Sequence, residues 1–375
     1  MTNLPSFSRR SLLGAGAAAA SAAALNRAAR AADARPDDVR CGIIGVGGRG
    51  YGLLQAIHKS PGVRVTALCD IDKDHLDRAG KAVEEDKPRL FDDYRRLIDF
   101  KDLDAVFVAT PCYLHREHDV AVLESDRHCY GEKPLALSVE DCRIIMNAAH
   151  KSKGLFQIGT QLRYAPPWNT AINAIRAGEF GKTLMIRAHR HNVGDYPHRS
   201  SWFFYRKLSG DTICEQAVHE FDLFNWIFDA LPLRAAGFGA GGFHKDPPDR
   251  DILDRYVLAL DYGDKGQVSY NHSWISTPKT YCDGRQEVVY CERAAIDIEN
   301  GMIFPREGEP RKVSTEPKGN YDQAAVNDFF RCVRENRKPL ANVETGFNAT
   351  MVALLGQKSM DTGRVESMKD LLAGG

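Results

Sequence analysis

The clearest structural signal in this 375-residue chain is CGIIGVGGRG at residues 41–50, followed by VTALCD at residues 65–70. An apolar strand, a glycine turn, a helix-length stretch, a second strand and an acid follow in that order. This order predicts a β-α-β unit that binds a dinucleotide. Gly45 permits the tight turn, Gly47 lets backbone amides approach a pyrophosphate, and Gly50 lets the helix pack closely on the strand.

The same segment predicts the identity of the cofactor. The helix that begins near Gly50 directs the positive end of its dipole at the phosphates. Asp70 supplies a carboxylate for a ribose 2′-hydroxyl and would repel a 2′-phosphate, and Arg64 lies too early to reverse this, so NAD is favoured over NADP. The cofactor contacts expected from this unit are Gly45, Val46, Gly47, Gly48, Arg49, Gly50, Asp70 and Ile71.

Length and charge set further bounds. A chain of 375 residues is long for one hydrophobic core, so two domains are expected. Fifty basic residues balance fifty acidic ones, which gives no electrostatic reason to expect nucleic acid or an acidic membrane surface as a partner. No apolar run beyond the amino-terminal segment is long enough to span a bilayer.

The amino terminus resembles a twin-arginine export signal. Ser8-Arg9-Arg10-Ser11-Leu12-Leu13 precedes a Gly/Ala-rich stretch and a small-residue site at Ala32-Asp33-Ala34. We expect residues 1–34 to be a signal peptide, the twin-arginine translocase to be a partner, and the mature protein to be periplasmic. An alanine-rich surface helix is the alternative. Nine cysteines without a paired spacing suit folding in the reducing cytosol before export.

An α/β fold with two sheets is expected beyond the signal. In residues 38–160, short apolar runs alternate with amphipathic stretches, which predicts a Rossmann domain with a doubly wound parallel sheet. Its expected strands are 40–44, 63–69, 104–109, 127–130 and 155–159, and its helices begin near Gly50, Asp72, Tyr94, His115 and Ser138.

Residues 161–322 predict a second α/β domain with a largely antiparallel sheet. Its expected strands are 183–191, 255–262, 266–274, 286–292 and 294–304, with helices at 167–177 and 212–228. Residues 323–375 are expected to form helices that pack back on the first domain.

Two further strands of the first domain end in polar motifs. Thr110-Pro111, with His115 after it, and Glu132-Lys133-Pro134 follow strands whose carboxyl ends form the ligand edge of a doubly wound sheet. We therefore expect Thr110, Pro111, His115, Glu132 and Lys133 to contact the cofactor.

With these motifs in this order, the chain resembles the Gfo/Idh/MocA oxidoreductases over nearly its whole mature length. The motifs are Gly45-x-Gly47-x-x-Gly50, Asp70, Thr110-Pro111-x-x-x-His115, Glu132-Lys133-Pro134, Arg163-Tyr164-x-Pro166 and Glu215-x-x-x-His219-x-x-Asp222. The resemblance implies an NAD(P)-binding Rossmann domain and a second domain, residues 161–322, with an open sheet that serves substrate binding and oligomerisation. It further implies a carbohydrate or cyclitol substrate between nicotinamide and sheet, and a homodimer or homotetramer.

The resemblance also implies roles for single residues. Lys133 matches the family's catalytic lysine, His219 its helix-borne histidine and Glu215 the carboxylate one turn earlier. Asp222 matches a substrate-contacting acid, and Arg163 and Tyr164 are expected beside the substrate. Glutamate replaces the usual aspartate at position 215, and Ser209-Gly210 replaces the usual glycine pair.

The residue types suit oxidation of a secondary alcohol. A base must take the hydroxyl proton as hydride leaves for the cofactor, and histidine titrates nearest neutral pH. Positions 215, 219 and 222 share one face of a helix, so we expect His219 as acid/base, Glu215 as its orienter and Lys133 as proton relay or electrostatic clamp. The alternative is an ordinary solvated pair of Glu215 and His219.

Other interpretations stay open at this level. His189, His191, His198, Cys214 and His219 lie close in sequence, but no set has clean metal-ligand spacing, and we expect no metal. Trp202 and Trp274 are candidates for stacking on a sugar ring or for the core, and we expect Trp202 beside the substrate. A non-catalytic nucleotide- or carbohydrate-binding module is a further alternative.

Export would change how the cofactor is used. Outside the cytoplasm no free NAD pool is available, so we expect the cofactor to stay bound and to be recycled on the protein. Redox-neutral chemistry through transient sugar oxidation is then an alternative, as epimerase, lyase or glycosidase. The Thr-His-Gly motif of the family's NAD-using glycosidases is not found after Tyr196-Pro197, which weighs against that activity.

Overall fold

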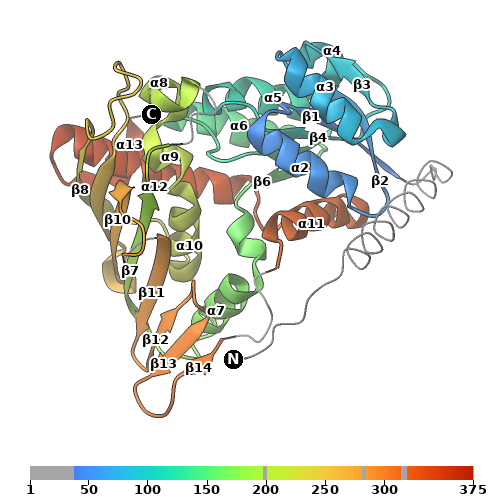
Figure 1. Ribbon diagram of the computed structural model, residues 1–375. Helices are drawn as coiled ribbons and strands as arrows, with labels where there is room; N and C mark the ends of the chain where they lie inside the picture. Colours follow the sequence, from blue (N-terminus) through green and yellow to red (C-terminus); the bar gives the residue numbers. More distant parts are fainter. Residues whose placement is uncertain (1–37, 197–200, 281–283, 314–318, 375) are drawn as a thin grey trace, which may run out of the picture.

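Two β-sheets, each with its own helices, organise the chain (Figure 1). The computed structural model describes residues 38–196, 201–280, 284–313 and 319–374, so the expected signal at residues 1–34 and His198 lie outside the described residues. The predicted fold class is confirmed: a parallel sheet is followed by a largely antiparallel one. Nowhere in those ranges is a helix both long and apolar enough to cross a membrane.

The first sheet has six parallel strands in the order β3-β2-β1-β4-β5-β6. The strands are β1 Val39–Ile44, β2 Val63–Cys69, β3 Arg89–Phe91, β4 Ala105–Val108, β5 His128–Gly131 and β6 Phe156–Ile158. The helices between them are α2 Gly48–His58, α3 Lys73–Ala82, α4 Tyr94–Ile98, α5 His115–Glu124 and α6 Val139–Lys151. β2 and β3 extend the sheet on one side of β1, and β4 begins its extension on the other side, so the carboxyl ends of β1 and β4 open a ligand crevice between them. Only the short β3 was not predicted.

The second sheet has nine strands in the order β14-β13-β12-β11-β7-β10-β9-β8-β15. Its strands are β7 Thr183–Val193, β8 Arg234–Ala240, β9 Arg255–Asp261, β10 Gln267–Ser276, β11 Gly284–Cys291, β12 Ala294–Asp297, β13 Met302–Pro305, β14 Arg311–Lys312 and β15 Glu366–Ser367. β7 and β10 pair in parallel and every other neighbouring pair is antiparallel. The predicted strand 294–304 is a hairpin of two strands, and the glycine-containing β8 was missed because it has few strand-favouring residues.

Helices cover one face of this second sheet, as Figure 1 shows for α10 and α12. The helices beyond the first domain are α7 Pro166–Arg176, α8 Arg206–Ser209, α9 Asp211–Glu215, α10 Val218–Phe228, α11 Tyr321–Glu335, α12 Val343–Thr362 and α13 Met368–Ala373. α11 packs on α2, whereas α12 contacts α10 and β8 as well as α6 of the first domain. The opposite sheet face carries exposed side chains, including Met185, Phe238 and Val257.

Candidate functional site

The glycine turn has the geometry of a phosphate site. Gly45 has φ +86°, and a Cβ there would lie 2.8 Å from the carbonyl oxygen of Ala109. A Cβ on Gly50 would lie 1.8 Å from the Gly45 carbonyl oxygen, so only glycine lets α2 approach β1 this closely. α2 starts after Gly47 with no side-chain cap and no acid in its first turn. The amide groups at this helix N-terminus are therefore suited to an anion such as the pyrophosphate of a dinucleotide.

Asp70 lies beside the glycine turn with its carboxylate fixed. One oxygen accepts from the backbone N–H of Val46 at 2.8 Å, and the other accepts from that of Asp72 at 2.9 Å. The next residue, Ile71, is 94 % exposed. A carboxylate held at this end of β2 fits a ribose diol and disfavours a 2′-phosphate.

Arg49 ties the glycine turn to two other parts of the chain. Its Nε donates to Glu132 at 2.7 Å, at the end of β5, and its Nη2 donates to Asp322 at 3.0 Å, on α11. Glu132 is 3 % exposed, so its carboxylate is shielded from solvent and has the Arg49 guanidinium as its ion-pair partner. Arg49 and Glu132 thus brace the predicted cofactor site, and the C-terminal α11 takes part in that brace.

His115 is a structural residue of the first domain. Its ring is 1 % exposed, with Nδ1 2.6 Å from the carbonyl oxygen of Pro134 and Nε2 3.0 Å from that of Thr110. Both ring nitrogens face backbone carbonyls, so none is left for a cofactor. His115 therefore joins the two polar loops at the ligand edge, and the direct contact expected from the sequence is replaced by a positioning role.

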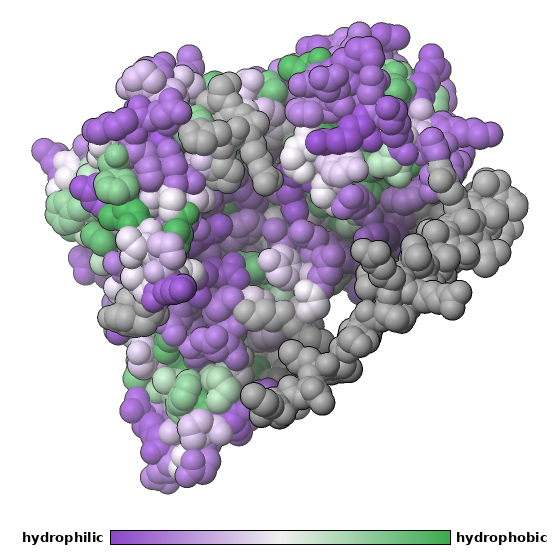
Figure 2. Space-filling view, viewed as in Figure 1, coloured by the Kyte–Doolittle hydropathy of each residue, from purple (hydrophilic) through white to green (hydrophobic). Residues whose placement is uncertain are grey.

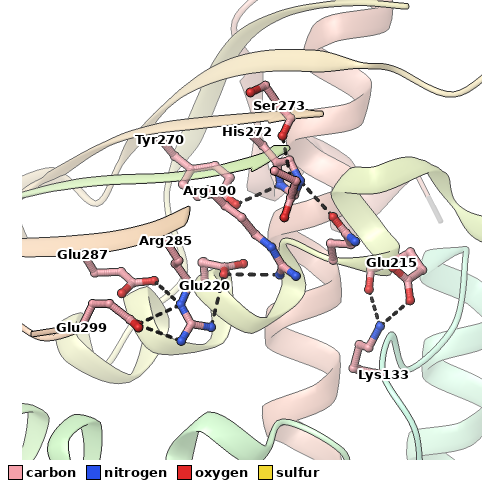
Figure 3. A network of polar contacts seen from close by, with 12 residues as sticks. Lys133, Arg190, Glu215, Glu220, Tyr270, His272, Ser273, Arg285, Glu287 and Glu299 are labelled. Carbon is pink, nitrogen blue, oxygen red and sulfur yellow. Dashed lines mark hydrogen bonds and ion pairs between the residues drawn. The ribbon is translucent and has the colours of Figure 1, made fainter. Parts of the chain in front are cut away.

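Lys133 and Glu215 join the two domains in an ion pair (Figure 3). The Lys133 Nζ donates to Glu215 Oε1 at 2.6 Å and also to the Glu215 backbone carbonyl. Their side chains are 14 % and 13 % exposed, so the pair lies near the surface between the domains without being open to bulk water. The space-filling view shows a recess between the two parts of the molecule that is bordered largely by hydrophilic residues (Figure 2).

The predicted helix 212–228 is broken between α9 and α10. The N–H of Ala217 donates to the carbonyl of Thr212, five residues back, which inserts a wider turn than an α-helix allows. Gln216, at the break, accepts from His272 Nε2 and Trp274 Nε1, both at 3.0 Å. The assumption that Glu215 lies on one continuous helix with His219 and Asp222 is therefore wrong, whereas His219 and Asp222 both lie on α10.

His219 nevertheless lies within electrostatic reach of Lys133. The imidazole is partly exposed, its Nδ1 is buried without a partner, and neither ring nitrogen hydrogen-bonds to any part of the chain that the structure describes. Burial, followed by the charges of Lys133, Arg190, Arg285 and Arg49, lowers its pKa well below the usual value. His219 is thus a neutral imidazole with an unused nitrogen, which is the state that a general base requires.

Arg163 and Asp222 are paired with each other in the interior. The guanidinium donates to the two carboxylate oxygens at 2.8 and 2.6 Å, and the two residues are 8 % and 1 % exposed. Arg163 also lies over the ring of Trp226, 4.8 Å from its centre. The substrate contacts expected from the sequence for Arg163 and Asp222 are corrected here, because these two buried side chains are paired with each other, Arg163 from η3 (Gln161–Tyr164) and Asp222 from α10.

The other residues expected at the substrate lie in different surroundings. The Tyr164 hydroxyl accepts from the backbone N–H of Ala341 at 3.3 Å, in the segment before α12. Trp274 is 8 % exposed and its ring lies 4.2 Å from that of Tyr196, so it is a core residue. Trp202 is half-buried against Phe203. His189 and His191 stack on each other, and the described ranges contain no cluster of three metal-ligating side chains.

A group of charged residues that the sequence analysis missed lies on the sheet beside His219. Arg190 of β7 and Arg285 of β11 are directly paired across the sheet, and both face the helices (Figure 3). Beneath them is Glu220, 0 % exposed, 3.5 Å from Arg190 and 3.8 Å from Arg285. The signal was present, because Arg190 continues the inward alternation of Ile186 and Ala188, where a charge is unusual.

Models of one protein family match both domains of the chain. Residues 39–160 match the family model described as "Oxidoreductase family, NAD-binding Rossmann fold", and residues 168–297 match the "GFO/IDH/MocA C-terminal domain". A solved structure of myo-inositol 2-dehydrogenase from Lactobacillus plantarum has the same fold, with a TM-score of 0.76 at 20% identity over 88% of this chain and 99% of that one.

Two curated relatives match part of the chain. A glycosyl hydrolase family 109 protein of Shewanella woodyi is 32% identical over 171 residues, which is 44% of this chain and 35% of the relative. An inositol 2-dehydrogenase of Salmonella typhimurium is 30% identical over 195 residues, which is 51% of this chain and 55% of the relative. The matched segments thus span from about a third to about half of these relatives. Together with the two family models, the geometry of both sheets shows that the chain belongs to the Gfo/Idh/MocA family of oxidoreductases.

Proposed function

We propose that this protein is an NAD-dependent oxidoreductase that acts on a CH–OH group of a sugar, cyclitol or glycoside. The observation that carries the proposal is the neutral, unpartnered His219 beside the interdomain pair of Lys133 and Glu215. The glycine turn and Asp70 supply a fitting dinucleotide site on the first domain. The similarity to an inositol 2-dehydrogenase supports a polyhydroxylated ring as substrate.

The residues divide the work as follows. The glycine turn and Asp70 would hold a nicotinamide dinucleotide, which when bound would supply the hydride acceptor or donor for the substrate carbon. His219 takes the hydroxyl proton, since a neutral imidazole is a competent base and its pKa keeps it neutral at physiological pH. Lys133 places a positive charge next to the developing alkoxide oxygen. Glu215 balances and orients that ammonium group.

We further propose that the protein is exported by its residues 1–34 and keeps its cofactor bound between turnovers. The brace formed by Arg49, Glu132 and Asp322 supports such retention, because it joins the glycine turn to the C-terminal α11. The test is to denature gel-filtered holoprotein and assay the released small molecules for NAD. A protein that releases no nucleotide would contradict tight retention.

Activity is tested by adding a panel of sugars and cyclitols to the holoprotein and following nicotinamide absorbance. His219→Ala should abolish the change seen with the best substrate, whereas Arg187→Gln, on the opposite sheet face, should leave it intact. Unchanged turnover in His219→Ala would remove the proposed base.

A second candidate function is redox-neutral chemistry through transient sugar oxidation. It is favoured by the similarity to a glycosyl hydrolase family 109 protein. Aryl glycosides cleaved without net formation of NADH would establish it. Stoichiometric NADH formation without cleavage would establish the dehydrogenase.

A further inference from the structure

The Arg190 guanidinium, which lies within electrostatic reach of His219, has N–H groups that donate no hydrogen bond to the described residues. It is 24 % exposed and makes one ion pair, with Glu220 at 3.5 Å, but no hydrogen bond to any residue within the ranges that the structure describes. A guanidinium has five N–H donors in a fixed fork. A partly buried fork without acceptors leaves hydrogen-bonding capacity that a ligand can use.

Arg285 differs from Arg190 in this respect. Its Nε and Nη2 donate to Glu299 at 3.2 and 2.9 Å, and its Nε lies 3.3 Å from Glu287. Arg285 is therefore held by carboxylates, and it flanks Arg190 as a positioning residue. The donors that remain for a ligand belong to Arg190.

A second unsatisfied donor lies near the same place. The Tyr196 hydroxyl is buried, has no hydrogen-bond partner among the residues that the structure describes, and belongs to a residue that is 1 % exposed. It lies within electrostatic reach of Glu215 and Arg190. Buried polar groups without partners are rare, and this hydroxyl is accounted for by an acceptor that the ligand brings.

The charge around Arg190 is already balanced. Glu220 has both oxygens buried and without hydrogen bonds, so Arg190 and Arg285 are its counter-ions. Burial raises the pKa of Glu287 to about 8, so this carboxyl is mostly protonated at neutral pH. Two guanidinium groups then face the two carboxylates of Glu220 and Glu299. A bound anion would add negative charge next to Glu220, whereas a hydroxyl oxygen would not.

We propose that Arg190 is a substrate-binding residue that donates to hydroxyl oxygens of an uncharged polyol ring, and that Glu220 beneath it disfavours substrates with a carboxylate or phosphate there. This inference rests on the proposed oxidoreductase function and narrows its substrate class. Tyr196 supplies a further donor to the same ring. The preference for neutral over anionic substrates comes from the ion pair of Arg190 and Glu220, whose charges already balance before substrate binds.

The experiment compares matched neutral and anionic probes on the holoprotein. Nicotinamide absorbance is followed with glucose against glucuronate, galactose against galacturonate, and myo-inositol, and kcat/KM is determined for each. The neutral member of the active pair should be preferred by at least about tenfold, the effect of one misplaced charge. A preference for the uronate would overturn the inference while leaving the oxidoreductase in place. No absorbance change with any probe would overturn the proposed function, and the inference with it.

Variants test the residues themselves. Arg190→Gln should raise KM for the best neutral probe about 10- to 100-fold, as expected for loss of charge-assisted hydrogen bonds, and Tyr196→Phe should raise it by a smaller factor. Arg187→Gln, on the same strand and the exposed face, is the matched control and should leave KM unchanged. An unchanged KM in folded Arg190→Gln would overturn the assignment.

Two further variants separate binding from folding and test the role of charge. Arg190→Gln with Glu220→Gln leaves no unpaired charge and should show the same rise in KM with wild-type thermal stability. Glu220→Gln alone leaves Arg190 uncompensated and should shift selectivity toward the uronate about tenfold. A selectivity that does not move would overturn the role given to Glu220.

Discussion

Replacing Asp222 by asparagine should unfold the protein at a lower temperature without removing a substrate contact. Asp222 is 1 % exposed and accepts two hydrogen bonds from Arg163, which is itself 8 % exposed. Losing one partner of a buried pair costs about 3–5 kcal/mol, because the remaining charge is left uncompensated. At roughly 2 °C per kcal/mol for a chain of this size, Tm should fall by about 6–10 °C.

The matched control is Asp229→Asn, at the end of α10. Asp229 pairs with Arg176 at 3.1 Å but is 77 % exposed, so its loss should cost less than about 1 kcal/mol. Asparagine tolerates the left-handed backbone of this position, φ 49°. Both variants are compared by thermal unfolding and by KM for the best sugar. A stable Asp222→Asn protein with a raised KM would refute the structural role and restore the substrate contact predicted from the sequence.

Three other outcomes follow from the site. The acid limb of kcat/KM against pH should lie below about 6.5, since burial and then nearby cations lower the pKa of His219; a limb at or above that value contradicts the assigned base. Glu287 binds its proton more tightly in the folded protein, so between about pH 4.5 and 8 this group lowers the free energy of unfolding as pH rises. Urea denaturation across this window should show Glu287→Gln losing less stability than wild type, by up to about 1.4 kcal/mol per pH unit. Parallel plots of unfolding free energy against pH for the two proteins would exclude this effect. Lys133→Met should lower kcat at least about 100-fold. Glu215→Gln should lower kcat less, because Lys133 keeps its hydrogen bond to the backbone carbonyl of residue 215. Equal losses of kcat in steady-state assays of the two variants would argue against that hydrogen bond.

Much of the first domain could be predicted because its signals are local. Gly45 and Gly50 are required by contacts with Ala109 and with the turn itself, and the strands of the parallel sheet are short apolar runs between helices. The boundaries of β2, Val63–Cys69, agree with the expectation residue for residue. The second sheet was predicted less well, since β8 has weak strand propensity and gains its place from β9 and β15.

The site was predicted in part, and the misses share one cause. Lys133 and Glu215 lie in different domains, and the family motifs had marked both as site residues. The structure pairs them. By contrast, helical spacing placed Glu215 on one continuous helix with His219 and Asp222, and the wide turn at Ala217 separates Glu215 on α9 from the other two on α10. That turn is held by contacts of Gln216 with β10, which helical periodicity cannot register.

The amino-acid sequence by itself determined the glycine turn, the acid of Asp70 and the parallel direction of the strands in the first sheet, because these depend on steric and hydrophobic patterns within about thirty residues. Tertiary structure alone decided that Arg163 pairs with Asp222 and that Arg190 lies against the buried Glu220. Arg190 meets Arg285 through the register of β7 and β11, and both meet Glu220 of α10. Which charged side chains become neighbours is decided by the packing of segments that are distant in sequence, and their burial then strengthens the electrostatic interaction between them.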